Sequence, residues 1–205
     1  MTSGAVAATD RSDFRSVLVG GTKVGVVTAV LVIACLAVTR LLPAGVSRDV
    51  VLSLLVLATG VLVSLLPGEW VVPRNTEGVA GTAAMGLWGT VVFMAIDIVL
   101  LRPFKAYPWT WDAIGGGSTW WYLPVWWMLG TFLAWMGGLL TAARNTPPRA
   151  PATLGQLAMP LVLGTVGLAA VSKLLGLPVA IPVLVGASYT VTLAALALLF
   201  TVRKA

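Results

Sequence analysis

Long apolar runs separated by short polar connectors are the dominant pattern of this sequence. The runs approach or reach the roughly 20 residues that an α-helix needs to cross the hydrocarbon of a bilayer. They cover residues 24–42, 50–66, 78–101, 119–142, 154–175 and 179–202. The pattern predicts an all-α integral membrane protein, a polytopic bundle of about six transmembrane helices. We expect a single membrane domain over residues 1–205, because few residues remain outside the runs.

Proline and glycine mark the connectors between these runs. Pro67 and Gly68 follow the second run, and they predict that its helix ends there. The segment 102–118 contains two prolines and three consecutive glycines, which argue against a continuous helix. We expect this Trp-containing segment to be an outer connector. Residues 1–22 are mostly small and polar, and we expect a cytoplasmic tail there.

Small side chains recur every four residues in the third and fourth runs. The third run carries Gly78, Thr82, Gly86 and Thr90, and the fourth carries Gly130, Ala134 and Gly138. This spacing places each set on one face of its helix, where small residues let two helix backbones approach closely. We therefore predict that the third and fourth helices pack against each other on these faces.

Tryptophan is concentrated around the start of the fourth run. Seven of the nine tryptophans lie between residues 108 and 135, namely Trp109, Trp111, Trp120, Trp121, Trp126, Trp127 and Trp135. Tryptophan is enriched at the membrane surface because its ring is apolar and its N–H needs a partner, so an ordinary aromatic belt is one interpretation. Trp126, Trp127 and Trp135 lie deeper than a belt requires. The alternative is a surface for other membrane subunits or for an apolar cofactor such as a lipid, a quinone or a carotenoid.

Charge is scarce and scattered along the chain. Only 10% of the residues are charged, against about 25% in an average soluble domain. The 13 basic residues are scattered along the chain, and this excludes the basic patch of a nucleic-acid-binding protein. With six spans, eight of them fall on the side of the termini and five on the other. This asymmetry predicts that both termini are cytoplasmic, and we expect a bacterial inner (plasma) membrane.

The side chains restrict the possible chemistry. The chain has no histidine, which excludes His-ligated haem, copper or zinc and imidazole acid–base catalysis. It has one cysteine, so no intrachain disulfide forms. We predict no metal site and no catalytic residue of its own.

Asp97 is the carboxylate within an apolar run. A carboxylate in a bilayer is costly and often functional, so Asp97 is a candidate ion or proton site. The structural alternative is local pairing, since Arg102 follows about one turn later with Lys105 nearby. Lys173, near the end of the fifth run, can extend its ammonium to the membrane surface or pair with Asp97.

Two functions fit these observations. The first is a non-catalytic integral membrane subunit of a larger respiratory, photosynthetic or oxidase/monooxygenase-type assembly. Such a subunit would contribute helix packing and the Trp-rich surface. The second is a small transporter or channel that uses Asp97, with Pro160 and Pro182 as hinge points. An enzyme that acts alone ranks third, because catalytic side chains are nearly absent.

Overall fold

The computed structural model describes residues 11–101, 122–145 and 152–203. Within these ranges, six helices are long and apolar enough to cross a membrane. The helices are α1 (Phe14–Leu41), α2 (Val46–Val71), α3 (Thr76–Ile96) with the π-helical turn η1 (Asp97–Leu101), α5 (Tyr122–Arg144), α6 (Leu154–Leu174) and α7 (Ile181–Val202). The predicted fold class, an all-α polytopic membrane bundle, is confirmed.

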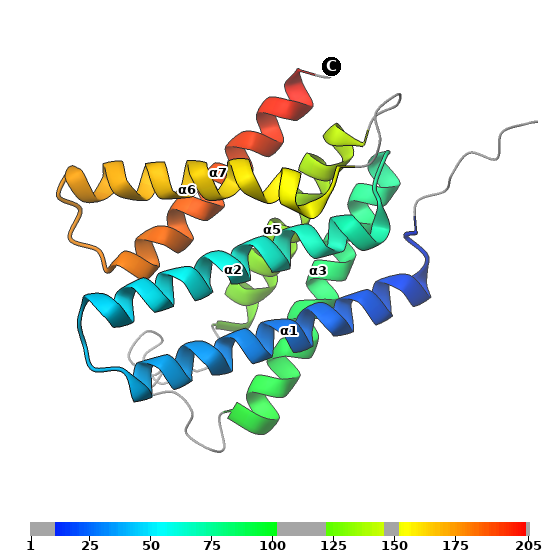
Figure 1. The fold of residues 1–205 in the computed structure, drawn as a ribbon. Coiled ribbons are helices and arrows are strands. Elements are labelled where there is room, and N and C mark those ends of the chain that lie inside the picture. Colours follow the sequence, from blue (N-terminus) through cyan, green and yellow to red (C-terminus); the bar gives the residue numbers. More distant parts are fainter. Residues whose placement is uncertain (1–10, 102–121, 146–151, 204–205) are drawn as a thin grey trace, which may run out of the picture.

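The helices are arranged in two layers (Figure 1). α1, α2 and α6 run side by side in one layer, and α3, α5 and α7 cross behind them. α2 occupies the middle of its layer and packs against all five other spanning helices. α1 begins and α7 ends toward the same end of the bundle, which is called the terminal end below; the opposite end carries the α1–α2 turn.

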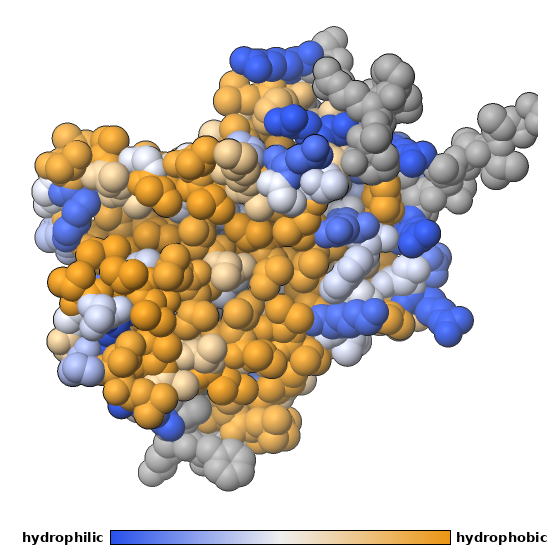
Figure 2. Space-filling view, in the orientation of Figure 1, coloured by the Kyte–Doolittle hydropathy of each residue, from blue (hydrophilic) through white to orange (hydrophobic). Residues whose placement is uncertain are grey.

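The surface of the protein is suited to a lipid bilayer. Apolar residues cover the middle of the face shown in Figure 2, and hydrophilic residues gather toward its ends. Large hydrophobic side chains on α1, α2 and α6 are more than half exposed, such as Val30, Leu54 and Leu163. An apolar surface this extensive is unfavourable in water, whereas lipid tails cover it in a membrane. The protein is therefore an integral membrane protein.

α1 begins at Phe14, earlier than the predicted start at residue 24. Asp13 caps the helix, because its carboxylate accepts a hydrogen bond from the Ser16 backbone N–H at 3.1 Å. Hydrogen bonding with Ser16 lowers the pKa of the Asp13 carboxyl, so the charged form is favoured beside the positive end of the helix dipole. Residues 14–22, expected in the tail, are thus part of the first helix.

α2 continues through Pro67 and Gly68, where the sequence predicts its end. Pro67 lacks the N–H that would bond to the Val63 carbonyl, which normally ends or kinks a helix. Membrane helices tolerate this loss where neighbouring helices pack around the site. Here Pro67 is buried, and a Cβ on Gly68 would lie 2.5 Å from the Thr141 hydroxyl oxygen of α5. The contact with α5 explains why the helix is not interrupted.

The small faces of the third and fourth spans meet between α3 and α5. A Cβ added to Gly86 would lie 2.8 Å from the Gly130 carbonyl oxygen, and it would also overlap the Ala134 methyl group. A Cβ added to Gly130 would overlap the Thr90 hydroxyl oxygen, and a Cβ added to Gly138 would overlap the Thr82 hydroxyl oxygen. Gly78 is buried at the start of α3. The two backbones approach as closely as the absence of side chains permits.

The other predicted boundaries differ little from the observed ones. α6 begins at the predicted residue 154, where Thr153 and Gln156 form a reciprocal capping box. α7 begins at Ile181 instead of residue 179, with Pro182 in its first turn. The predicted connector 102–118 and the first residues of the fourth span lie outside the described residues.

Candidate functional site

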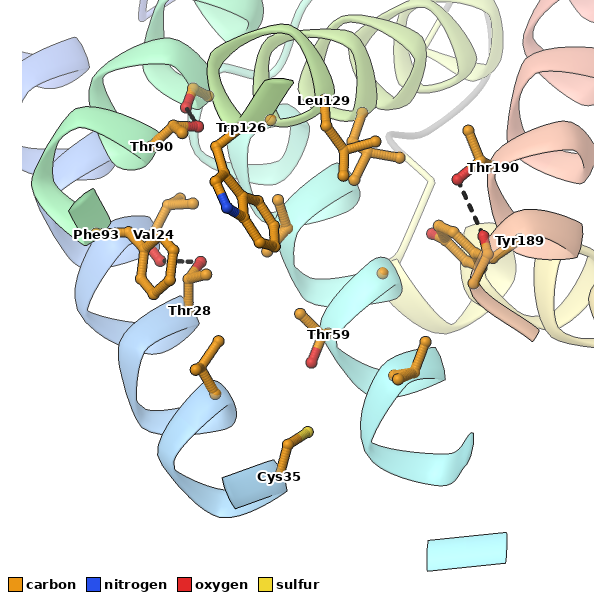
Figure 3. Close-up of a pocket in the computed structure, with 18 of the residues that line it drawn as sticks. Val24, Thr28, Cys35, Thr59, Thr90, Phe93, Trp126, Leu129, Tyr189 and Thr190 are labelled. Carbon is orange, nitrogen blue, oxygen red and sulfur yellow. Dashed lines mark hydrogen bonds between the residues drawn. The ribbon is translucent and has the colours of Figure 1, made fainter. Parts of the chain in front are cut away.

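A cavity of about 630 Å³ lies among α1, α2, α3, α5 and α7 (Figure 3). Its volume falls within the range of about 300–1,000 Å³ that is typical of small-molecule sites. The walls are formed almost entirely by apolar atoms. Labelled lining residues include Thr28, Cys35, Thr59, Phe93, Trp126 and Tyr189.

The cavity lies beside the middle of α1 and α2 and the first half of α7. On α7 its lining begins at Pro182, the second residue of the helix, and ends at Thr190. On α1 the lining runs from Val24 to Cys35, which is about 16 Å at 1.5 Å per residue. The hydrocarbon core of a bilayer is about 30 Å thick. The lining of α1 therefore covers about half of this thickness, and it lies in the middle of the helix.

The polar groups of the lining are satisfied within the protein. Each lining threonine donates its hydroxyl hydrogen to a carbonyl of its own helix: Thr28 to Val24 at 2.8 Å, Thr59 to Leu55 at 2.7 Å, Thr90 to Gly86 at 2.9 Å and Thr190 to Gly186 at 3.0 Å. The Tyr189 hydroxyl bonds to the Ser64 hydroxyl at 2.7 Å. A molecule in the cavity therefore meets hydrocarbon and ring surfaces rather than free hydroxyl donors.

Trp126 and Phe93 form an aromatic pair on one wall. Their ring centroids are 5.7 Å apart and the rings are inclined by 68°, an edge-to-face arrangement that aromatic rings favour. Trp126 extends from α5 into the space between α1 and α2 (Figure 3). It anchors the end of the cavity where α5 begins.

Trp127 and Trp135 do not line this cavity. Trp127 is 41% exposed and Trp135 is 46% exposed, so both present part of their rings on the outside of α5. Trp126 and Trp127 diverge because successive residues on a helix point about 100° apart. Trp109, Trp111, Trp120 and Trp121 lie outside the described residues.

Asp97 and Lys173 differ in exposure. Asp97 is 2% exposed and begins the η1 turn after α3. Lys173 is exposed near the end of α6, so it is not a buried partner for a carboxylate. Neither residue lines the cavity. Arg102 and Lys105, the predicted partners of Asp97, fall outside the described residues.

Sequence reasoning missed the cavity, although four glycines pointed toward it. Gly60, Gly86, Gly130 and Gly186 line it from four different helices. Three of them sit in close contacts, but a Cβ on Gly186 would meet only Val56, at 3.4 Å. The sequence does not distinguish a glycine that borders a cavity from a glycine at which two helices are in close contact.

In the described part of the chain, no cluster of three or more His, Cys, Asp or Glu residues could hold a metal ion. Comparison of the chain with protein-family models, curated proteins and solved structures found no match. The chemistry of the cavity is thus the observation from which a function is inferred.

Proposed function

We propose that this protein is a non-catalytic subunit of a larger membrane complex, of respiratory, photosynthetic or oxidase/monooxygenase type, and that its cavity holds an apolar molecule such as a lipid, a quinone or a carotenoid. The observation that carries the proposal is the cavity of about 630 Å³ among five helices. The cavity is partly open, and its apolar walls do not retain water. An apolar molecule in the cavity would cover these walls.

The side chains around the cavity support a binding role over catalysis. Among the described residues that line the cavity, Cys35 has the one thiol, and no histidine, lysine or carboxylate stands beside it. A catalytic thiol needs a neighbouring base or cation that favours its thiolate. The threonine hydroxyls are engaged with backbone carbonyls, as described above. These groups can shape a ligand site, but they do not form an acid–base pair.

The exposed tryptophans of α5 supply the surface for a partner subunit. Trp127 and Trp135 present large aromatic area outside the bundle. Aromatic side chains carry a large share of the binding energy where a partner buries them. The apolar ligand and the partner subunit are thus assigned to two sides of one helix, with Trp126 directed inward and Trp127 outward.

Native mass spectrometry tests both parts of this proposal. The chain is extracted from its own membrane in mild detergent, and we expect subunits of unlike mass together with a bound apolar molecule. Trp127→Ala with Trp135→Ala should release the partner and keep the bound molecule. Trp126→Ala should release the bound molecule and keep the partner. A wild-type chain that carries neither a partner nor a bound molecule would contradict the proposal.

We further propose that the protein resides in a bacterial inner membrane with both termini in the cytoplasm. The support is the eight-to-five distribution of basic residues between the two sides in the sequence.

A small transporter is the second candidate, and the burial of Asp97 favours it. This carboxylate is 2% exposed in a membrane-spanning segment and begins a π-helical turn, a feature that recurs at functional sites. Against it, Asp97 does not line the cavity, and the cavity offers an ion almost no polar surface. Proton and cation flux into liposomes separates the two functions. Flux that Asp97→Asn abolishes in a normally folded protein would establish the transporter; absence of flux in the wild type favours the subunit.

A further inference from the structure

We propose that Trp126 selects the occupant of the cavity. Its indole N–H donates a hydrogen bond to the one oxygen of a neutral molecule that is otherwise hydrocarbon, such as a long-chain ketone or an isoprenoid with one carbonyl group. This inference rests on the proposed function and narrows its ligand class. Three features carry it: the depth of Trp126, the state of its N–H and the hydrogen bonds of the other lining residues.

Trp126 lies deep among the spanning helices. Its ring packs against the buried cluster that contains Ala29 and Phe93. Ala29 is about 9 Å of helix rise from Lys23, toward the terminal end, and about 17 Å from Arg40, toward the α1–α2 turn. These two charged residues flank the apolar part of α1. The cluster is therefore away from both headgroup regions, where tryptophan N–H groups ordinarily find their partners.

The indole N–H of Trp126 makes no hydrogen bond to a described residue, and its nitrogen is accessible rather than enclosed by protein. By contrast, the Trp88 N–H donates to the Thr22 hydroxyl oxygen at 3.1 Å. The Phe93 ring beside Trp126 is only a weak acceptor. An unpaired N–H is costly within a bilayer, because no water replaces the missing bond. A carbonyl oxygen on the bound molecule would satisfy this donor.

The other lining residues offer no comparable donor. The hydroxyl hydrogens of the four lining threonines go to backbone carbonyls, and the Tyr189 hydroxyl is paired with Ser64. Cys35 adds only the weak donor of a thiol. A quinone ring would leave its second carbonyl without a partner, and a phospholipid headgroup would place charges against apolar walls. A molecule with one uncharged oxygen leaves no polar group of its own unpaired.

The shape of the cavity suits a chain attached to that oxygen. The lining extends about 16 Å along α1, from Val24 to Cys35. Its walls are formed almost entirely by apolar atoms. A hydrocarbon chain would cover these walls while its oxygen stays beside Trp126.

A competition between two matched probes tests the inference. Methyl pentadecyl ketone and heptadecane have the same carbon chain with and without a carbonyl group, and both are added in excess to the purified protein in detergent. The protein is isolated again, and gas chromatography compares the bound ratio of the two probes with their ratio in micelles without protein. We expect the wild type to prefer the ketone about two- to tenfold, as one hydrogen bond provides.

Two tryptophan variants provide a matched comparison. Trp126→Phe keeps an aromatic ring but lacks the N–H, so its bound ratio should fall to that of the micelles. Trp88→Phe removes an N–H that is already paired with Thr22, and Trp88 does not line the cavity, so the wild-type preference should remain.

Infrared spectroscopy gives a second measurement. The carbonyl stretch of an isotope-labelled ketone should move to lower frequency in the wild type and in Trp88→Phe, but not in Trp126→Phe. The ratio and the shift in the wild type do not depend on the folding of any variant.

Each failure has a distinct meaning. A wild-type ratio equal to that of the micelles, or a preference that Trp126→Phe retains, would overturn the inference and leave the proposed apolar site in place. Preferential binding of decylubiquinone from an equal mixture with the ketone would overturn the single-oxygen ligand class and also leave that site in place. If no probe is retained saturably and native mass spectrometry finds no bound molecule, both the inference and the proposed ligand site fail.

Discussion

Tyr189 is the largest fully buried side chain among the residues that the structure describes, and it belongs to both the cavity wall and the core. Its hydroxyl bonds to the Ser64 hydroxyl at 2.7 Å, which links α7 to α2. Both hydroxyls are buried among apolar neighbours, so removal of one would leave the other without this hydrogen bond and would destabilise the fold. The pair satisfies both polar groups and fixes the position of the Tyr189 ring beside the cavity.

A double-mutant cycle measures this hydrogen bond. Tyr189→Phe and Ser64→Ala should each lower the free energy of unfolding by about 1 kcal/mol, since each leaves a buried hydroxyl or a small void behind. The double variant should lose clearly less than the sum of the two single variants, because it removes both polar groups at once. Unfolding in mixed detergent micelles gives the values. Strictly additive losses would show that the two hydroxyls do not interact.

At the residue scale, the sequence identified candidates but not their surroundings. The depth of Trp126 in its span made it a candidate for a ligand surface, and it does line the cavity. Asp97 could be recognised as a carboxylate in an apolar run, but its burial, at 2% exposure, could not be predicted because it depends on the helices packed around it. Tyr189 was not singled out, since a tyrosine in an apolar run carries no sign of a partner on another helix.

At the scale of helices, the contact between α3 and α5 depends on the absence of side chains. A Cβ on Gly86 would meet the backbone of Gly130, which cannot rotate aside as a flexible side chain can. In a lipid environment, close packing of this kind is a main source of helix association. This contact also forms one wall of the cavity, because Gly86 and Gly130 line it.

Gly86→Leu should therefore separate α3 from α5. We expect it to cost at least the roughly 1–3 kcal/mol of an overpacked core, and to lower the thermal midpoint in detergent. Ala84→Leu is the matched control, since Ala84 is exposed on the same helix and its substitution should stay within about 0.5 kcal/mol of the wild type. Equal midpoints for the two variants would contradict the assigned contact.

The helices themselves were largely predictable, because their signals are local. Apolar length and four-residue spacing depend on neighbours along the chain, so the spans and the two small faces could be read from the sequence. The end of α2 could not be predicted from the sequence. Whether Pro67 stops a helix depends on Gly68 meeting Thr141 of α5, a contact between residues far apart in sequence. The early start of α1 depends on the Asp13 cap, which the prediction overlooked.

At the scale of the molecule, the cavity follows from how two layers of helices cross. Five helices contribute to it, and no single helix shows it in its own sequence. The arrangement could not be predicted because apolar periodicity is weak where nearly every position is apolar. The orientation of the bundle in the membrane rests on the basic residues of its connectors.

Cysteine accessibility tests that orientation. In a Cys35→Ala background, Thr76→Cys is the first residue of α3, next to the α2–α3 connection, and Ala44→Cys lies on the α1–α2 turn; both positions are exposed. We expect a membrane-impermeant maleimide to label Ala44→Cys in intact cells. It should reach Thr76→Cys only after the membrane is opened, because two ends of one spanning helix lie on opposite sides. Labelling of both positions from one side would contradict the topology.

The occupancy of the cavity is tested most directly by counting the apolar molecules that purify with the chain. Wild type, Gly186→Leu and Gly167→Leu are purified identically, extracted with organic solvent and quantified by mass spectrometry. We expect the wild type and Gly167→Leu to carry equal amounts of one apolar species in fixed proportion to protein. Gly186→Leu should carry several-fold less, since its side chain occupies the same space. Equal amounts in all three proteins, or none in the wild type, would contradict a ligand in this cavity.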